Sequence, residues 1–483
     1  MRLGDLLIQA KLVTAEQVAH ALELQAEHGG RMGDHLVAEG AIAQQTLEDF
    51  LHRIPAEPTD LAATRIESTE LMSILMKLIY VEHLETVRQF IESIKLPYNI
   101  VIELVRMGID RHLIHTLGTR ESGNPLDMSY AFTEGGRRWV LDALNQSRYA
   151  GPAPVTLDEF NHQINLQKLT NEVITFERIR NSFGALTVED KIIEQAGPAL
   201  NSGRALLLYG PPGNGKTSVA LCFASVFTDV IYVPYAVTVE GQIMRVYDPS
   251  LHVALDTDMA TQEGVLSFVR REEYDARWVP CKRPFVVVGG ELTLEMLDLR
   301  YDPSTNIYEA PMHVKALGGC FVIDDFGRQL VSPANLLNRW IVPLESRVDY
   351  LKLHTGKSFT IPFEETVVFS TNLDPEDLMD PAFLRRLPYK IEIAGPSIDI
   401  YKRIFVKECE RQGVALPQDM FDFILYKVIE DKRLELANYQ PKFIVDQVVA
   451  TCRFLHQPPH FEPRFIEYAI DNLSVKRPHS KEH

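Results

Sequence analysis

Apolar and polar residues follow two different patterns along the 483 residues of this chain. Before about residue 150 and after about residue 397, apolar residues recur every three or four positions, which is the spacing of amphipathic helices. Between these regions they form short unbroken runs, such as 205–209 and 320–323, which are typical of strands buried in a parallel sheet. The pattern predicts a multidomain α/β protein with a central sheet and helical ends.

Proline-rich segments divide the chain, which is too long for a single hydrophobic core. The clearest of these linkers are 54–60 and 151–155. We expect a small helical tandem-repeat domain, a second small α+β domain, an α/β/α core and a helical C-terminal lid. Their predicted boundaries are 1–54, 61–150, 155–396 with a β insertion at about 248–318, and 397–475, followed by a flexible tail at 476–483.

The first fifty-odd residues contain a repeat, which fixes their architecture. Segment 2–13 is matched 29 positions later by segment 31–42, and both begin with Arg, an apolar residue, Gly and Asp. Each copy continues into an amphipathic helix. In the first copy, Thr14 and Gln17 have the spacing of a capping box, in which each side chain bonds to the backbone N–H of the other residue.

This repeat resembles the MshEN-type domain at the N-terminus of type II secretion and pilus-extension ATPases, whose tandem motifs bind cyclic di-GMP. A guanidinium group suits the ligand because it can stack on guanine or bond its edge or a phosphate. Lys11 and Ile54 depart from the motif, in place of a glycine and a glutamine. The alternative is a helical adaptor that docks a secretion or pilus component without any messenger. The residues implied to bind cyclic di-GMP are Arg2, Leu3, Gly4, Leu22, Gln25, Arg31, Met32, Gly33, Asp34, Leu47 and Leu51.

The second unit resembles a winged-helix domain. Helical periodicity covers 70–80, 83–94 and 96–117, the last in two pieces, and is followed by a strand at 128–132 and a capped helix at 133–144. Winged helices often read DNA with one helix in the major groove.

The candidate helix of this unit carries Arg106, Arg111 and His112 in an apolar and acidic neighbourhood. We therefore favour a role in protein docking or signal coupling over DNA recognition.

Residues 210–217 match the phosphate-binding template G-x-x-x-x-G-K-[ST], between a predicted strand and a predicted helix. Glycines let the backbone N–H groups point at a polyphosphate, and the helix dipole adds positive potential. Lys216 is expected to reach the β- and γ-phosphates, and Thr217 to bind Mg²⁺. The predicted ATP-binding residues here are Gly210, Pro211, Pro212, Gly213, Asn214, Gly215, Lys216, Thr217 and Ser218.

Two acids follow the apolar strand at 320–323, where the ends of parallel strands meet ligands. Asp324 is predicted to hold Mg²⁺ and Asp325 to polarise the attacking water. A further strand, 366–371, ends at Asn372. We also expect a second parallel strand at 230–237, and a β-hairpin insertion that includes the runs 284–288, 291–297 and 307–317.

Residues from about 157 to 475 resemble the AAA+ ATPase family. The resemblance implies Walker A and B motifs at 210–217 and 320–325, sensor 1 at Asn372, and ATP with Mg²⁺ as cofactors. It also implies an arginine-finger region at Arg385 and Arg386, supplied to a neighbour in a six-membered ring. Lys442 stands where a sensor 2 arginine is expected. Asp325 departs from the glutamate usual in this family, which bears on the rate of hydrolysis.

Composition adds limits on partners and location. The net charge of −17 disfavours broad nonspecific binding of nucleic acids, and no apolar run is long enough to span a membrane. Five scattered cysteines without a C-x-x-C pair indicate reduced thiols in a cytoplasm. We expect a cytoplasmic ATPase that is regulated by cyclic di-GMP and acts on a protein client. The other hypotheses are a DNA-associated regulator and an ATP-switched docking scaffold.

Overall fold

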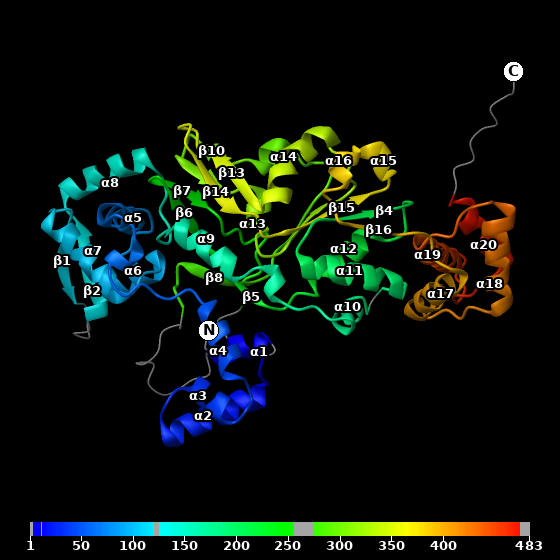
Figure 1. Cartoon of the computed structure of the whole chain (residues 1–483), viewed down its shortest axis with the longest axis horizontal. Coiled ribbons are helices and arrows are strands. Elements are labelled where there is room, and N and C mark those ends of the chain that lie inside the picture. Colours follow the sequence, from blue (N-terminus) through cyan, green and yellow to red (C-terminus); the bar gives the residue numbers. More distant parts are fainter. Residues whose placement is uncertain (1–2, 11, 120–124, 185, 256–273, 474–483) are drawn as a thin grey trace.

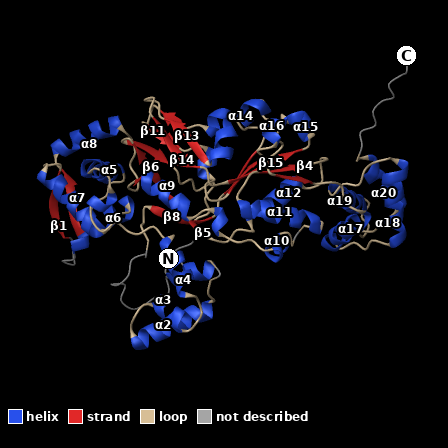
Figure 2. Ribbon diagram, viewed as in Figure 1, coloured by secondary structure: helices blue, strands red, loops and turns tan. Residues whose placement is uncertain are grey.

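A computed structural model of the chain describes residues 3–10, 12–119, 125–184, 186–255 and 274–473. In Figure 1 the second helical unit, a mixed sheet, the core sheet and the C-terminal helices follow one another along the longest axis. The N-terminal helices α1 to α4 lie beside this row. Figure 2 shows that strands are concentrated in the middle of the molecule and helices at its ends, as the hydrophobic pattern predicts.

The N-terminal module consists of four helices in two pairs. Gly4 lies where an added β-carbon would be 2.6 Å from Val18, and 29 residues later Gly33 lies where one would be 3.0 Å from Leu47. The two glycines therefore let the helices of each pair pack closely. The capping box of Thr14 and Gln17 is confirmed. The helices are α1 (Leu3–Gln9), α2 (Ala15–His28), α3 (Met32–Ala38) and α4 (Gln44–His52).

The second unit packs four helices against a two-stranded antiparallel hairpin. The predicted strand at 128–132 and the cap of the last helix by Thr133 are confirmed. The helix predicted to reach residue 117 ends at Asp110, because residues 114–119 pair with the second strand instead. The elements are η1 (Ala62–Thr64), α5 (Ser68–Val81), α6 (Val87–Ile94), α7 (Tyr98–Asp110), β1 (Ile114–Thr119), η2 (Pro125–Asp127), β2 (Met128–Phe132) and α8 (Glu134–Gln146).

The core is a five-stranded sheet in the order β16-β4-β15-β12-β9, and every neighbouring pair is parallel. Alternate residues of each strand face opposite layers. Leu206 and Leu208 pack with the helices preceding and following β4, whereas Leu207 packs with α14 and α16. The strands are β4 (Leu206–Tyr209), β9 (Phe285–Val288), β12 (Cys320–Ile323), β15 (Thr366–Thr371) and β16 (Tyr389–Glu392).

Helices cover both faces of this sheet, as Figure 1 shows. One layer contains α10 (Phe176–Ser182), α11 (Asp190–Ser202) and α12 (Lys216–Ala224). The other contains α13 (Met312–Lys315), α14 (Pro333–Ser346), α15 (Pro375–Leu378) and α16 (Pro381–Leu384). The hairpin of β13 (Val348–Lys352) and β14 (Ser358–Pro362) follows α14.

The prediction of a second parallel strand at 230–237 was wrong. Residues 230–234 form β5 (Val230–Pro234), which pairs antiparallel with β8 (Trp278–Lys282) outside the core sheet. The edge strand of the core is β9, from the run that was expected to belong to the insertion. Run 291–297 is also no strand, since it ends in the short helix η4 (Leu294–Leu297). An apolar run indicates that a strand is buried, but it does not indicate which strand pairs with it. The sequences of 230–234 and 284–288 therefore did not reveal to which sheet each segment belongs.

A second five-stranded sheet has the mixed order β10-β11-β7-β6-β3. Its strands come from three distant segments of the chain, and α9 packs against it. The elements of this region are β3 (Val155–Thr156), α9 (Leu157–Leu166), η3 (Leu169–Asn171), β6 (Ala236–Val239), β7 (Gln242–Arg245), β10 (Arg300–Asp302) and β11 (Ile307–Glu309).

The C-terminal lid is helical, as predicted, and has its own hydrophobic core. It contains α17 (Ile398–Gln412), α18 (Gln418–Leu425), the π-helical segment η5 (Tyr426–Asp431), α19 (Tyr439–Phe454) and α20 (Pro463–Asp471). Among the described residues, no helix combines the length and the apolar character needed to cross a membrane.

Candidate functional site

The phosphate-binding loop connects β4 to α12 at the edge of the core sheet. Gly210, Gly213 and Gly215 have φ values of 131°, 81° and 87°, which side chains other than glycine rarely adopt. The Lys216 side chain folds back onto the loop, and its Nζ donates to the carbonyls of Gly210 and Pro211 at 2.9 Å each. Burial lowers the pKa of Lys216, while the nearby carboxylates of Asp325 and Asp324 act in the opposite direction. The lysine is thus held inside the loop.

Thr217 and Asp324 meet across the sheet edge. The Thr217 hydroxyl donates to Oδ2 of Asp324 at 2.8 Å. Thr217 is the second residue of α12, and Asp324 directly follows β12, so the sheet order brings them together. A hydroxyl and a carboxylate are hard oxygen ligands of the kind that Mg²⁺ prefers. These residues therefore fit a magnesium ion.

Asp325 is joined to the end of the neighbouring strand. Its Oδ1 accepts a hydrogen bond from Nδ2 of Asn372 at 2.8 Å. Asp325 has a φ of 49°, in the left-handed region, and its side chain is exposed. This conformation turns the side chain away from the strand direction, toward Lys216 of the loop at 210–217.

Gln329 stabilises this strained turn and was not identified from the sequence. Its Nε2 donates to the carbonyls of Asp324 at 3.0 Å and Asp325 at 3.3 Å, and its Oε1 accepts from the N–H of Gly327 at 2.8 Å. Nothing in the local sequence marks this glutamine, because its partners are backbone atoms whose positions depend on the turn.

A cavity of about 200 Å³ lies beside the phosphate loop, between the core and the lid. Its lining combines apolar side chains, among them Val188, Ile192 and Ile393, with a similar number of polar and charged ones. Its lining residues are Thr187, Val188, Glu189, Lys191, Ile192, Gln195, Tyr209, Asn214, Val219, Lys390, Glu392, Ile393, Ala394, Gly395, Pro396, Ile400 and Asn438.

The lid contacts the loop through Asn438 and Tyr439. Asn438 Nδ2 donates to the carbonyl of Asn214 at 2.8 Å, and the N–H of Tyr439 donates to the carbonyl of Gly213 at 3.0 Å. An added β-carbon at Gly213 would lie 2.4 Å from the Tyr439 ring. Lys442, the residue predicted for sensor 2, is exposed and does not line the cavity.

The two arginines predicted as fingers differ in their surroundings. Arg386 Nε donates to Oε1 of Glu345 at 2.6 Å, and its Nη1 donates to the carbonyl of Ala382 at 2.9 Å. Arg385 is exposed, and within the described parts of the chain its guanidinium makes no hydrogen bond or ion pair. Only Arg385 is therefore available to a neighbouring molecule without first breaking a contact.

The residues proposed to bind cyclic di-GMP differ in their exposure to solvent. Gly4, Met32, Gly33 and Leu47 are buried between the helix pairs. Arg2 lies outside the described residues. At the surface, Leu22 and Leu51 are 40% and 42% exposed, and they occupy equivalent positions of the repeat, 29 residues apart.

The remaining members of the set lie close to the surface. Arg31 and Asp34 are exposed and Leu3 is partly buried. Gln25 is partly buried, and its Nε2 donates to the carbonyl of Gly30 at 2.9 Å. Gln25 thus ties the end of α2 to the start of the second repeat.

Comparison with known proteins places one part of the chain in a family model. Residues 397–472, which form the lid, match a domain of unknown function (DUF8689). No curated protein matches the sequence.

Several solved structures are similar to parts of the chain. A mutant of RuvB from Thermotoga maritima shares 12% identity over 63% of this chain and 73% of its own, at a TM-score of 0.32. NtrX from Brucella abortus shares 12% identity over 72% of this chain and 60% of its own, at a TM-score of 0.35. The AAA domain of FIGL-1 shares 13% identity over 57% and 73%, at 0.31. The identities and TM-scores of all three structures are low. The core is therefore described from its own parallel sheet order and from the motif at 210–217.

Proposed function

We propose that this protein is an AAA+ ATPase that hydrolyses ATP to ADP and phosphate. One observation carries the proposal: Thr217 bonds to Asp324 and Asn372 bonds to Asp325, each at 2.8 Å, at the sheet edge that holds the phosphate loop. Four polar residues from three separate segments converge there. A glycine-rich turn without a ligand would not require that convergence.

The residues of the site then have distinct roles. The loop N–H groups and Lys216 bind the phosphates, and the cavity between core and lid receives the base. Thr217 and Asp324 would hold Mg²⁺, which would neutralise charge on the phosphates. Asp325 and Asn372 orient a water molecule for attack, and Asp325 accepts its proton. Phosphoryl transfer depends on positioning and charge more than on covalent chemistry, and this set supplies both.

The proposal includes a ring of six subunits, in which Arg385 enters the neighbour's site. The exposed, unbonded guanidinium supports this choice over Arg386, which Glu345 holds. A head-to-tail contact of this kind closes into a ring when the rotation between subunits allows it.

We further propose that cyclic di-GMP binds the N-terminal module and regulates the ATPase. Leu22 and Leu51 support a binding role, because the repeat keeps two leucines exposed at equivalent positions where core packing does not require them. The exposed Arg31 lies at the start of the second repeat. By linkage, a messenger that changes the ring must have an affinity that ATP changes in return.

Steady-state ATP hydrolysis with and without cyclic di-GMP tests both parts. Lys216→Ala should abolish turnover in either condition, because it removes the charge that meets the transferred phosphate. Arg31→Ala should leave basal turnover intact and remove the response to the messenger. Wild-type protein without magnesium-dependent hydrolysis would refute the ATPase proposal. Hydrolysis that ignores the messenger would refute the regulatory part and favour a docking module at 1–54.

A further inference from the structure

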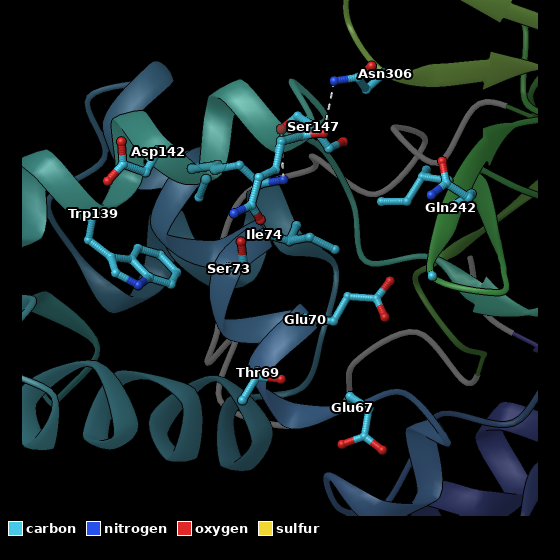
Figure 3. A pocket seen from close by; sticks show the side chains of 15 residues that line it. Glu67, Thr69, Glu70, Ser73, Ile74, Trp139, Asp142, Ser147, Gln242 and Asn306 are labelled. Carbon is cyan, nitrogen blue, oxygen red and sulfur yellow. Dashed lines mark hydrogen bonds between the residues drawn. The ribbon is translucent and has the colours of Figure 1, made fainter. Parts of the chain in front are cut away.

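A cavity of about 630 Å³ lies far from the phosphate loop, where the second helical unit meets the mixed sheet. Figure 3 shows it between α5 and α8 on one side and the turn of β6 and β7 on the other. The lining residues are Glu67, Thr69, Glu70, Ser73, Ile74, Lys77, Trp139, Asp142, Ala143, Gln146, Ser147, Gly241, Gln242, Ile243 and Asn306.

The charges of this cavity are unequal. Three carboxylates, from Glu67, Glu70 and Asp142, line it together with a single ammonium group, from Lys77. Glu67 and Asp142 are exposed, whereas Glu70 is partly buried, and its carboxylate is directed into the space in Figure 3. The lining therefore favours a positively charged occupant.

The ammonium group of Lys77 makes a hydrogen bond within the protein. Lys77 is 4% exposed, and its Nζ donates to the carbonyl of Ser147 at 3.1 Å. Burial lowers its pKa to about 8, against the opposing effect of Glu70. Burial also raises the pKa of Glu70, whose Oε1 accepts from the Thr238 hydroxyl at 3.1 Å. The second oxygen of Glu70 has no hydrogen bond within the described chain.

Apolar surfaces complete the cavity. Trp139 on α8 is partly buried, and Ile74 and Ile243 lie on opposite sides of the joint. A tryptophan ring attracts cations through its face, and aliphatic side chains pack against a hydrocarbon stem.

We propose that this cavity binds an aliphatic primary amine or guanidinium, with the cationic head at Glu70 and the stem along Ile74 and Trp139. The cation is either a free small molecule or the Lys or Arg side chain of a peptide. This site is separate from the proposed nucleotide and cyclic di-GMP sites, and the proposal does not depend on either of them.

An occupant here touches both sides of a joint. Around the cavity, Asn306 Nδ2 donates to the carbonyl of Gln146 at 3.0 Å, and the N–H of Arg148 donates to the carbonyl of Thr305 at 2.8 Å. The bond from Thr238 to Glu70 crosses the same joint. A bound cation adds a further link between the second unit and the mixed sheet.

Titration of the full-length protein with agmatine tests the proposal, with glutarate as an anion of similar length. Trp139 reports on binding by fluorescence because the other two tryptophans, Trp278 and Trp340, are 3% and 1% exposed. We expect saturable binding of agmatine and none of glutarate. Calorimetry should give the same affinity.

Glu70→Gln with Asp142→Asn should weaken agmatine binding about tenfold or more, since it removes the carboxylate that binds the cationic head and a second negative charge of the lining. Asp419→Asn with Glu430→Gln, which neutralises two exposed lid carboxylates, is the matched control and should bind as the wild type does. If the double variant unfolds, Glu70→Gln alone replaces it, because the glutamine oxygen can still accept from the Thr238 hydroxyl. No saturation by agmatine, equal binding of glutarate, or full affinity in the acid variants would overturn the proposal.

A capped Gly-Arg-Gly peptide distinguishes the two sources of the cation. Tighter binding of the peptide than of agmatine indicates a peptide side chain, and the reverse order indicates a free amine or guanidine. Either order supports a cation site, whereas failure of both ligands contradicts it.

Discussion

The two five-stranded sheets of this protein are built in different ways. The core sheet is parallel throughout, and each of its strands β4, β12 and β15 ends in residues of the candidate site. The mixed sheet combines strands from 155–156, 236–245 and 300–309, and two of its four pairings are antiparallel. Its strands are at most four residues long. The core presents chemistry at one edge, whereas the mixed sheet joins distant parts of the chain.

Buried polar side chains hold the mixed sheet in place. Arg277 is 1% exposed, and it bonds to Asp275, to Glu159 on α9 and to the carbonyl of Pro154. We therefore expect substitutions at the core edge to change turnover with little change in stability, and substitutions around the mixed sheet to do the opposite.

The largest effect is expected for Arg385→Ala. An arginine finger contributes about 10³–10⁵ in rate, so turnover should fall by that factor while ATP binding and thermal stability are retained. Arg386→Ala is the internal control, and it should cost far less because Arg386 is held by Glu345. Measurements of the ATPase rate and of the nucleotide affinity of both variants decide which arginine is the finger. Equal losses for both variants would contradict the assignment of the finger to Arg385.

Arg277→Ala should be the most destabilising change near the mixed sheet. It leaves Asp275, which is 2% exposed, as an unpaired buried charge, at a cost of about 3–5 kcal/mol. Denaturant unfolding followed by the fluorescence of the adjacent Trp278 measures this loss. Lys357→Ala breaks an exposed pair with Glu240 and should cost about 0–1 kcal/mol. Similar losses in both variants would remove the special role of the buried arginine.

The last prediction concerns a buried carboxyl group in the core, and its effect depends on pH. Glu365, just before β15, is 0% exposed, and neither of its carboxyl oxygens has a hydrogen bond. Burial raises its pKa well above the usual value, so the folded protein keeps a proton that the unfolded chain releases. This contribution to stability is present at acidic pH and is lost as pH rises, by up to about 1.4 kcal/mol per pH unit.

Glu365→Gln keeps the shape of the side chain and removes its titration. The difference in unfolding free energy between variant and wild type should therefore shift in favour of the variant between pH 5 and 8. Denaturant titrations across that range provide the measurement. A constant difference would mean that Glu365 ionises alike in both states.

Sequence reasoning succeeded where the determining contacts are local. The cap of Thr133, the capping box of Thr14 and Gln17, and the strand of 128–132 depend on residues a few positions apart. The strand, turn and helix around 210–217 are also determined locally and were found as expected, whereas phosphate binding there stays a prediction. The positions of Asp324 and Asn372 followed from one further rule, that parallel strands end at the same edge.

It failed where pairing is distant in the chain. Segment 230–234 reads as a core strand, yet its partner is β8, more than forty residues further on. Gln329 and Asn438 bond mainly to backbone atoms, so their residue types carry no recognisable signal. The cavity of Glu70 and Lys77 is formed by residues from four segments, and no single stretch of sequence marks it.

Helix α19 contacts the loop at 210–217 with its first residue, so a small rotation there moves its far end over a larger distance. Its first residue is bonded to Gly213, and its sixteen residues extend about 24 Å from that point. A tilt of about 5° at Tyr439 therefore moves the other end by about 2 Å. Because α17 and α20 pack on α19, the whole lid follows that rotation. A small displacement of the loop at 210–217 would thus move the exposed surface of these helices by a larger distance.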